Sequence, residues 1–127
     1  MNKVIRIGTR GSKLALWQAD HIARLIKPSG YTTEVVPIET KGDTILDVSI
    51  AKIGSKGVFT EEIEARLLDG SIDIAVHSAK DLSSELPDEL ELIAFTEREQ
   101  PNDVVVSTQK DFNMANGTPR VGTSATR

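Results

Sequence analysis

The residues best suited to chemistry in this sequence follow one short apolar run, Ile74 to Val76. Four polar residues come directly after it: His77, Ser78, Lys80 and Asp81. A continuous apolar run of this length is typical of a strand that is buried on both faces. Open α/β sheets bind their ligands just beyond the carboxyl ends of such strands. The adjacent cation and carboxylate are therefore a candidate site, although from this stretch alone an ordinary loop cap explains them equally well.

Basic side chains gather in the turns and in one long loop: Arg10, Lys13, Lys52, Lys56, Lys80 and Arg127. Acidic residues concentrate elsewhere, at 61–64 and 85–103. Arginine binds carboxylates and phosphates through paired hydrogen bonds, and glycine-rich turns add backbone N–H donors. This distribution predicts a small polyanion as the ligand. The alternative is that the loop lysines are simply solvated, and we prefer it for Lys13.

Asp81 does not fit a site that binds only anions. Its carboxylate repels an anionic ligand unless it contacts a positive group or an N–H on the same ligand. Asp81 therefore suggests general acid/base catalysis or stabilisation of a cation. The alternatives are an ion pair with Lys80 and a helix cap.

An α/β fold with an open, mostly parallel sheet flanked by helices is expected to position these residues. Strands at 4–7 and 32–38 enclose a helix that begins after Ser12, and this βαβ order implies a parallel pair. Pro37 indicates an edge strand or a bulge. Four further elements are expected. Phe59, Ile63 and Leu67 recur at helical spacing and predict a second helix, and strands are predicted at 74–76, 91–96 and 104–107.

Apolar residues of the first helix share one broad arc: Leu14, Ala15, Leu16, Ala19, Ile22, Ala23, Leu25 and Ile26. His21 lies on the flank beside Trp17, and we interpret it as a packing residue. The connection 39–57 shows little periodicity, and a connection of that length in a compact domain is usually functional or mobile. Its segment 54–57 lacks the full phosphate-loop pattern.

Composition narrows the function classes. The chain has 127 residues and a formal net charge of −4, which does not favour bulk nucleic-acid binding. It contains no cysteine and two histidines, so neither a thiolate site nor a multi-histidine metal site is predicted. The sequence shows no signal-peptide core and no bilayer-spanning segment, so we expect a cytoplasmic protein without membrane contact.

Five segments, taken together and in this order, resemble the porphobilinogen deaminase (hydroxymethylbilane synthase) family. They are Arg6–Ala19, Thr40–Asp43, Ala51–Phe59, Asp73–Asp81 and Val121–Ser124. The family's chain is longer, so the resemblance implies an N-terminal portion.

The resemblance also implies the architecture. The fold is expected to resemble the type II periplasmic-binding-protein fold. Residues 1–99 correspond to most of domain 1, and residues 100–127 to the hinge and the start of domain 2. The rest of domain 2 and all of domain 3 are absent from this sequence. The complete enzyme is expected to be a monomer.

The activity implied by the resemblance is the joining of four porphobilinogen units with release of ammonia, on a dipyrromethane cofactor. Asp81 matches the family's catalytic aspartate, which hydrogen-bonds pyrrole N–H groups and stabilises a cationic intermediate. The positions that match substrate-binding residues are Arg10, Ser12, Lys52 and Lys56. The positions that match cofactor-binding residues are Ser12, Lys80, Thr123, Ser124 and Arg127.

The family attaches its cofactor to a cysteine of its third domain, and this chain has none. We therefore expect the 127 residues to be inactive alone. Ala125-Thr126 replaces the family's usual Ser-Leu, which weakens the expected cofactor contacts there. The second function class is a small-anion, or polycarboxylate, binding module, but Asp81 among the cations favours the transferase.

Overall fold

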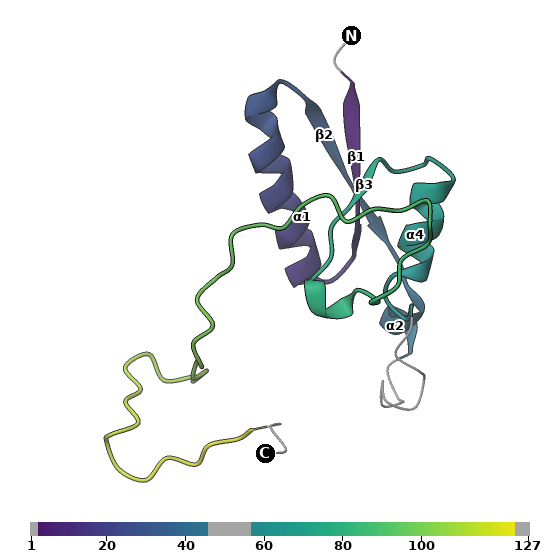
Figure 1. Cartoon of the computed structure of the whole chain (residues 1–127). Helices are drawn as coiled ribbons and strands as arrows, with labels where there is room; N and C mark the ends of the chain where they lie inside the picture. The colour runs from purple at the N-terminus through teal and green to yellow at the C-terminus, as the bar shows by residue number, and fades with distance from the viewer. Residues whose placement is uncertain (1–2, 46–56, 124–127) are drawn as a thin grey trace. The chain divides into compact units, whose positions relative to one another are not determined.

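The computed structural model describes residues 3–45 and 57–123. It divides into two units, Met1–Ile93 and Ala94–Arg127. The first unit holds a parallel three-stranded sheet in the order β2-β1-β3, formed by β1 (Val4–Arg10), β2 (Thr32–Ile38) and β3 (Ile74–Ala75) (Figure 1). The expected α/β class, the parallel βαβ pair and the edge position of the Pro37 strand are therefore confirmed.

The turn after β1 starts the first helix as expected. In α1 (Lys13–Ile26) the Ser12 hydroxyl accepts a hydrogen bond of 3.3 Å from the Ala15 N–H, which satisfies one free donor of the first turn. The short 3-10 helix η1 (Lys27–Ser29) continues α1, and Gly30 ends it with a φ of 83°. That left-handed conformation suits glycine, which has no Cβ to clash.

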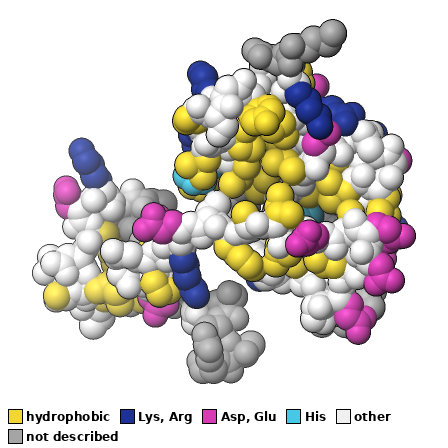
Figure 2. All heavy atoms as spheres, turned by 45° about the horizontal axis from the view of Figure 1, so that its top comes forward, with side chains coloured by type: hydrophobic (Ala, Val, Ile, Leu, Met, Phe, Trp, Pro, Cys, Tyr) yellow, Lys and Arg dark blue, Asp and Glu magenta, His cyan; other side chains and the backbone are white. Residues whose placement is uncertain are grey.

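The apolar arc of α1 is wider than the face that packs on the sheet. Ala19 is buried, whereas Leu14 remains 59% exposed and Leu25 is also exposed. Trp17 is exposed and its ring stacks on that of His21, with centroids 5.5 Å apart, so the interpretation of His21 as a packing residue is confirmed. Figure 2 shows the hydrophobic side chains that lie open on one side of the molecule.

The opposite face of the sheet packs against α4 (Glu61–Leu68) (Figure 1). Ile38, Ile63 and Ile72 form the buried cluster there, and each isoleucine stabilises the fold by about 1.5–3 kcal/mol when fully buried. Phe59, which we expected inside this helix, lies before its first residue. Gly70, with a φ of 74°, follows the C-cap residue of α4, as the sequence predicts.

The prediction of a strand at 74–76 buried on both faces is only partly right. β3 has two residues, and both are half-buried. Among the described residues β3 pairs only with β1, so its other edge has no partner strand to cover it. The 3-10 helix η2 (Ala79–Asp81) follows β3 and carries the polar cluster.

The predicted strands at 91–96 and 104–107 are wrong, because the structure assigns neither range to a strand. Their apolar side chains are exposed, to 93% for Val106, and a strand is stable only when a neighbour accepts its hydrogen bonds. Conversely, the aperiodic connection contains an unexpected short helix, α2 (Lys41–Thr44).

An ion pair between Arg6 and Asp73 joins β1 to the residue before β3. Arg6 Nε and Nη2 donate to the Asp73 carboxylate at 3.0 and 3.1 Å, and the Arg6 backbone N–H donates to it at 2.8 Å. These hydrogen bonds lower the pKa of Asp73 to about 2. The pair therefore ties the two strands together through a carboxylate that stays charged in mild acid.

This pair gives the first prediction, a loss of stability in acid. The pKa of Asp73 is depressed on folding, so its contribution is fully present above pH 4 and is lost as the pH falls toward 2. The thermal unfolding midpoints of the wild type and of Asp73→Asn should be measured at several pH values between 2 and 5. At pH 5 the midpoint of the wild type should be the higher of the two. The difference should shrink as the pH falls, and a constant difference would contradict the assignment.

Candidate functional site

The side chains of the candidate site lie where the three strands end. Arg10 is the last residue of β1, Asp43 lies in α2 after β2, and Asp81 lies in η2 after β3. The strands are parallel, so their carboxyl ends meet at one edge of the sheet, where open α/β sheets bind ligands. The topology therefore brings together three charged residues that are far apart in the sequence.

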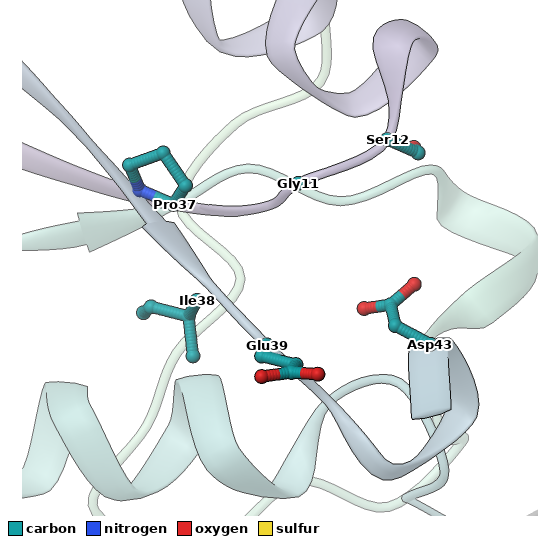
Figure 3. A pocket seen from close by; sticks show the side chains of 6 residues that line it. All are labelled: Gly11, Ser12, Pro37, Ile38, Glu39 and Asp43. Atoms are coloured by element: carbon teal, nitrogen blue, oxygen red, sulfur yellow. The ribbon is translucent and has the colours of Figure 1, made fainter. Parts of the chain in front are cut away.

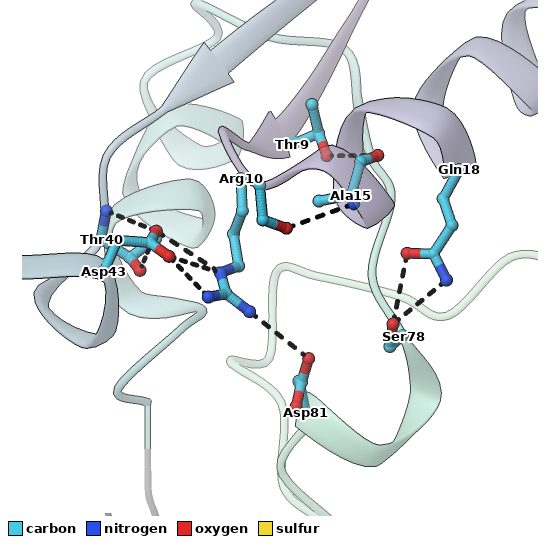
Figure 4. Close-up of polar contacts among 9 residues, drawn as sticks. Thr9, Arg10, Ala15, Gln18, Thr40, Asp43, Ser78 and Asp81 are labelled. Atoms are coloured by element: carbon cyan, nitrogen blue, oxygen red, sulfur yellow. Dashed lines mark hydrogen bonds and ion pairs between the residues drawn. The ribbon is translucent and has the colours of Figure 1, made fainter. Parts of the chain in front are cut away.

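Arg10 is the centre of this group. Its Nη2 and Nε donate to Oδ1 of Asp43 at 2.5 and 3.1 Å, and its Nη1 lies 3.8 Å from Oδ2 of Asp81 (Figure 4). The Arg10 guanidinium carbon lies 3.9 Å from the centroid of the Phe59 ring, a cation–π contact. Both Arg10 and Asp43 have side chains that are 22% exposed, so solvent screens this ion pair less than a surface pair.

Asp43 is held from its other side by Thr40. The Thr40 hydroxyl donates to Oδ2 of Asp43 at 2.7 Å, and the Thr40 backbone N–H donates to the same oxygen at 3.3 Å (Figure 4). Burial raises the pKa of Asp43, but the hydrogen bonds from Arg10 and Thr40 outweigh burial and lower that pKa overall. Asp43 is therefore ionised at neutral pH and pairs with Arg10 as a carboxylate.

Asp81 lines a small cavity of about 70 Å³ together with the residues that the sequence singled out. The cavity is lined by Arg10, Ser12, Leu14, Ala15, Gln18, Val76, His77, Ser78, Lys80 and Asp81. The Asp81 side chain is 18% exposed. Burial lowers the pKa of His77, which favours the neutral imidazole in this cavity. The lining thus combines one carboxylate with a guanidinium, an ammonium and two hydroxyls.

Gln18 and Ser78 close the side of the cavity next to α1. The Gln18 Nε2 donates to the Ser78 hydroxyl at 3.1 Å, and that hydroxyl lies 3.2 Å from Gln18 Oε1, to which it can donate instead (Figure 4). This contact links the first turns of α1 to the segment after β3. It fixes Ser78, whose backbone carbonyl accepts a hydrogen bond from the Asp81 N–H at 2.9 Å.

A larger and more open hollow of about 410 Å³ lies beside this group. It is lined by Gly11, Ser12, Pro37, Ile38, Glu39 and Asp43 (Figure 3). Ser12 borders both spaces, and Asp43 connects the hollow to the Arg10 ion pair. The strand ends therefore offer more room than the small cavity alone.

The structure unites some of the predicted site residues. Arg10, Ser12, Lys80 and Asp81 line one cavity. Thr123 belongs to the unit Ala94–Arg127, which is described by itself. Four further predicted residues lie outside the described residues: Lys52, Lys56, Ser124 and Arg127.

Sequence reasoning missed Asp43, Phe59 and Gln18 as neighbours of the site. A signal existed for Asp43, because Thr40 and Asp43 have the spacing of a capping box, and the structure contains that box. No comparable signal links Phe59 or Gln18 to Arg10 or Ser78, since these contacts join segments far apart in the sequence.

Neither a metal nor a membrane is indicated by the described part of the chain. No group of three or more potential metal-binding side chains occurs in residues 3–45 and 57–123. Within the same ranges, every helix is too short or too polar to cross a bilayer.

Gly42 gives a second prediction. A Cβ at this position would lie 2.0 to 2.7 Å from atoms of the Phe59 ring, so Gly42→Ala must displace the ring on which Arg10 stacks. We expect this variant to lose about 1–3 kcal/mol of unfolding free energy, as overpacking usually costs. Gly11→Ala is the control, because a Cβ there meets nothing within 4 Å. Equal denaturant midpoints for the two variants would contradict the expected clash.

Comparison with known proteins identifies the family of the chain. The family model described as "Porphobilinogen deaminase, dipyromethane cofactor binding domain" matches residues 5–127. The chain is similar to the porphobilinogen deaminases of Desulfosudis oleivorans, Cytophaga hutchinsonii and Syntrophomonas wolfei, with identities of 59%, 55% and 54%. These alignments cover 97%, 100% and 97% of the chain but 40%, 41% and 41% of the relatives. The chain thus spans about 40% of the length of these relatives.

Proposed function

Because the chain belongs to the porphobilinogen deaminase family, we propose that the protein containing these residues is a transferase of tetrapyrrole biosynthesis. It joins four porphobilinogen units into hydroxymethylbilane and releases ammonia at each step. The observation that carries this proposal is the presence of Asp81 in the same cavity as Arg10, Ser12 and Lys80. A site with this lining suits a ligand that has both carboxylates and N–H groups, as porphobilinogen does.

Asp81 is the proposed catalytic residue. Its carboxylate accepts hydrogen bonds from pyrrole N–H groups and stabilises positive charge that develops on the substrate. Because its side chain is mostly shielded from water, this stabilisation is stronger than it is for an exposed carboxylate. Lysine and arginine alone cannot perform this role, since both carry positive charge.

Arg10 and Ser12 are the proposed ligands of the acetate and propionate groups of the substrate. Nη1 of Arg10 faces Asp81 across the cavity and is not among the donors that Asp43 occupies, so it is positioned to contact a carboxylate there. Lys52 and Lys56 extend this substrate-binding set in the proposal on the basis of the family resemblance alone.

The cavity residues also fit a dipyrromethane group. Cations and hydroxyls can bind its carboxylates, and a carboxylate can accept its N–H hydrogen bonds. Ser12 and Lys80 would hold it from the first unit, and Thr123, Ser124 and Arg127 complete the proposed set. When bound, the group supplies the pyrrole terminus to which new units are joined. These 127 residues contain no cysteine, so the attachment thiol is proposed to lie elsewhere in the protein.

The remaining features of the proposal concern the whole protein. Residues 1–99 form most of a first domain and residues 100–127 contain the hinge and the start of a second, with a fold like that of type II periplasmic binding proteins. The complete enzyme is a cytoplasmic monomer that binds neither nucleic acid nor membranes. The parallel sheet with helices on both faces supports the α/β architecture of this proposed fold.

The test uses the full-length protein and porphobilinogen. We expect ammonia release coupled to formation of a linear tetrapyrrole, both measured over time. The competing function, a polycarboxylate-binding module, predicts saturable binding of porphobilinogen and of simple polycarboxylates without ammonia release. Binding without turnover by the full-length protein would therefore contradict the transferase and favour the binding module.

A further inference from the structure

Asp43 is a charged residue of this site to which the proposed function gives no role. Both of its carboxylate oxygens accept hydrogen bonds from the protein, and Arg10 reaches both, since its Nε also donates to Oδ2 at 3.4 Å. Oδ1 accepts the hydrogen bonds of 2.5 and 3.1 Å from Arg10, and Oδ2 accepts those of 2.7 and 3.3 Å from Thr40. With both oxygens engaged by the protein, this carboxylate suits a holding role better than direct contact with a ligand.

Three contacts together fix the Arg10 guanidinium. Asp43 binds its Nε and Nη2 edge, and the Phe59 ring lies against its face, 3.9 Å from the guanidinium carbon. Thr40 fixes Asp43 in turn. The group left facing the cavity is Nη1, which lies 3.8 Å from Asp81, beyond hydrogen-bond distance.

The two distances also determine which carboxylate compensates the positive charge of Arg10. A direct, charge-assisted pair at 2.5 Å is much stronger than a contact at 3.8 Å without a hydrogen bond. The charge of Arg10 is therefore directed mainly to Asp43. Asp81 keeps its negative charge available for a ligand in the cavity.

We infer that Asp43 is a positioning residue of the porphobilinogen site, because it holds Arg10 with Nη1 toward the cavity and prevents Arg10 from pairing tightly with Asp81. This inference rests on the proposed function. Without Asp43, the guanidinium is free to turn toward Asp81, the other carboxylate that pairs with it within the described residues. When the Arg10 guanidinium turns to pair with the Asp81 carboxylate, neither group is available to the substrate.

The experiment compares Asp43→Asn and Asp43→Glu in the full-length protein with porphobilinogen. We expect kcat of Asp43→Asn to fall about 10- to 100-fold, the change that corresponds to the loss of roughly one charge-assisted hydrogen bond. The fall should be mainly in kcat rather than KM, because the charge of Asp81 acts on the transition state. Asp43→Glu restores the carboxylate and should recover part of the rate.

Asp73→Asn is the matched control. It removes a carboxylate that also pairs with an arginine of β1, but the pair it breaks involves Arg6 and lies outside the cavity lining. Both variants should lower the thermal midpoint, whereas only Asp43→Asn should lower kcat. An equal fall in kcat for the two variants would reduce Asp43 to a structural residue.

A double-mutant comparison tests whether Asp43 acts through Arg10. In an Arg10→Lys background, Asp43→Asn should cause a much smaller further loss of kcat than in the wild type. Full additivity, or unchanged turnover by Asp43→Asn, would overturn the inference while the transferase stands. A full-length wild type that releases no ammonia would instead overturn the proposed function and, with it, the role of Asp43 in turnover.

Discussion

Asp81→Asn in the full-length protein is expected to lower porphobilinogen turnover by about 10²–10³-fold, the effect of removing one preorganised electrostatic contact to a reacting group. The amide has almost the same shape as the carboxylate but carries no charge to offset the developing cation. Asp81→Glu keeps the charge and changes only its reach, so it should retain part of the activity.

The Asp81→Asn variant should still fold. The contact that joins the Asp81 side chain to Arg10 is 3.8 Å long, and the hydrogen bond that fixes η2 uses the Asp81 backbone N–H. We expect the unfolding free energy to change by about 1 kcal/mol or less, because the substitution weakens one ion-pair contact of 3.8 Å. Ammonia release and thermal unfolding measure the two effects separately.

Asp88→Asn is the charge-matched control for this experiment. Asp88 is an exposed carboxylate that follows Asp81 closely in the sequence, and it does not line the cavity. Its loss changes the net charge by the same amount without touching the site. Near-native turnover by Asp81→Asn, or an equal loss with Asp88→Asn, would remove Asp81 from the mechanism.

Arg10→Leu is expected to lower kcat/KM by about 10- to 150-fold, which corresponds to the ~1.5–3 kcal/mol of a charge-assisted hydrogen bond. The structure indicates that Arg10→Leu also destabilises the fold, which the position of Arg10 at a strand end does not by itself suggest. Asp43 loses its partner while its side chain remains only 22% exposed, and an unpaired carboxylate in such a place is unfavourable. We therefore expect the unfolding midpoint in denaturant to fall as well.

Arg10→Lys separates these two effects. The lysine ammonium can pair with Asp43 and preserve much of the stability, but it lacks the planar group that contacts Asp43, Phe59 and the cavity together. It should therefore be closer to the wild type in stability than in turnover. Arg6→Leu, which breaks the Arg6–Asp73 pair, is the control that should lose stability alone. Native turnover by Arg10→Leu would contradict the assigned role.

The sequence was sufficient to predict that Arg10 and Asp81 lie at strand ends in the same candidate site. Each follows an apolar run that becomes a strand, and parallel strands bring their carboxyl ends to one edge whatever their separation in the chain. Ser12 was predictable for a local reason, because a hydroxyl before an apolar helix caps its first turn.

The parts that could not be predicted depend on contacts between distant segments. Phe59 reaches Arg10 because α2 packs closely against it at Gly42, a proximity that no spacing rule encodes. The strand prediction at 91–96 failed for the converse reason. The local pattern there suits a strand, but no neighbouring strand pairs with that range in the structure. β-structure is decided by a partner as much as by the segment itself.

The shortness of β3 has a consequence for how the site fails. Two ladder pairs, Ile7 with Ile74 and Gly8 with Ala75, attach this strand to β1, whereas β1 and β2 pair over seven positions. Elements with few backbone hydrogen bonds open locally at a lower free-energy cost than the whole fold. Opening of β3 would carry η2 and Asp81 away from Arg10 while α1, β1 and β2 stay folded. The geometry of the candidate site is therefore less stable than the architecture of the fold, and we expect it to be lost first on heating.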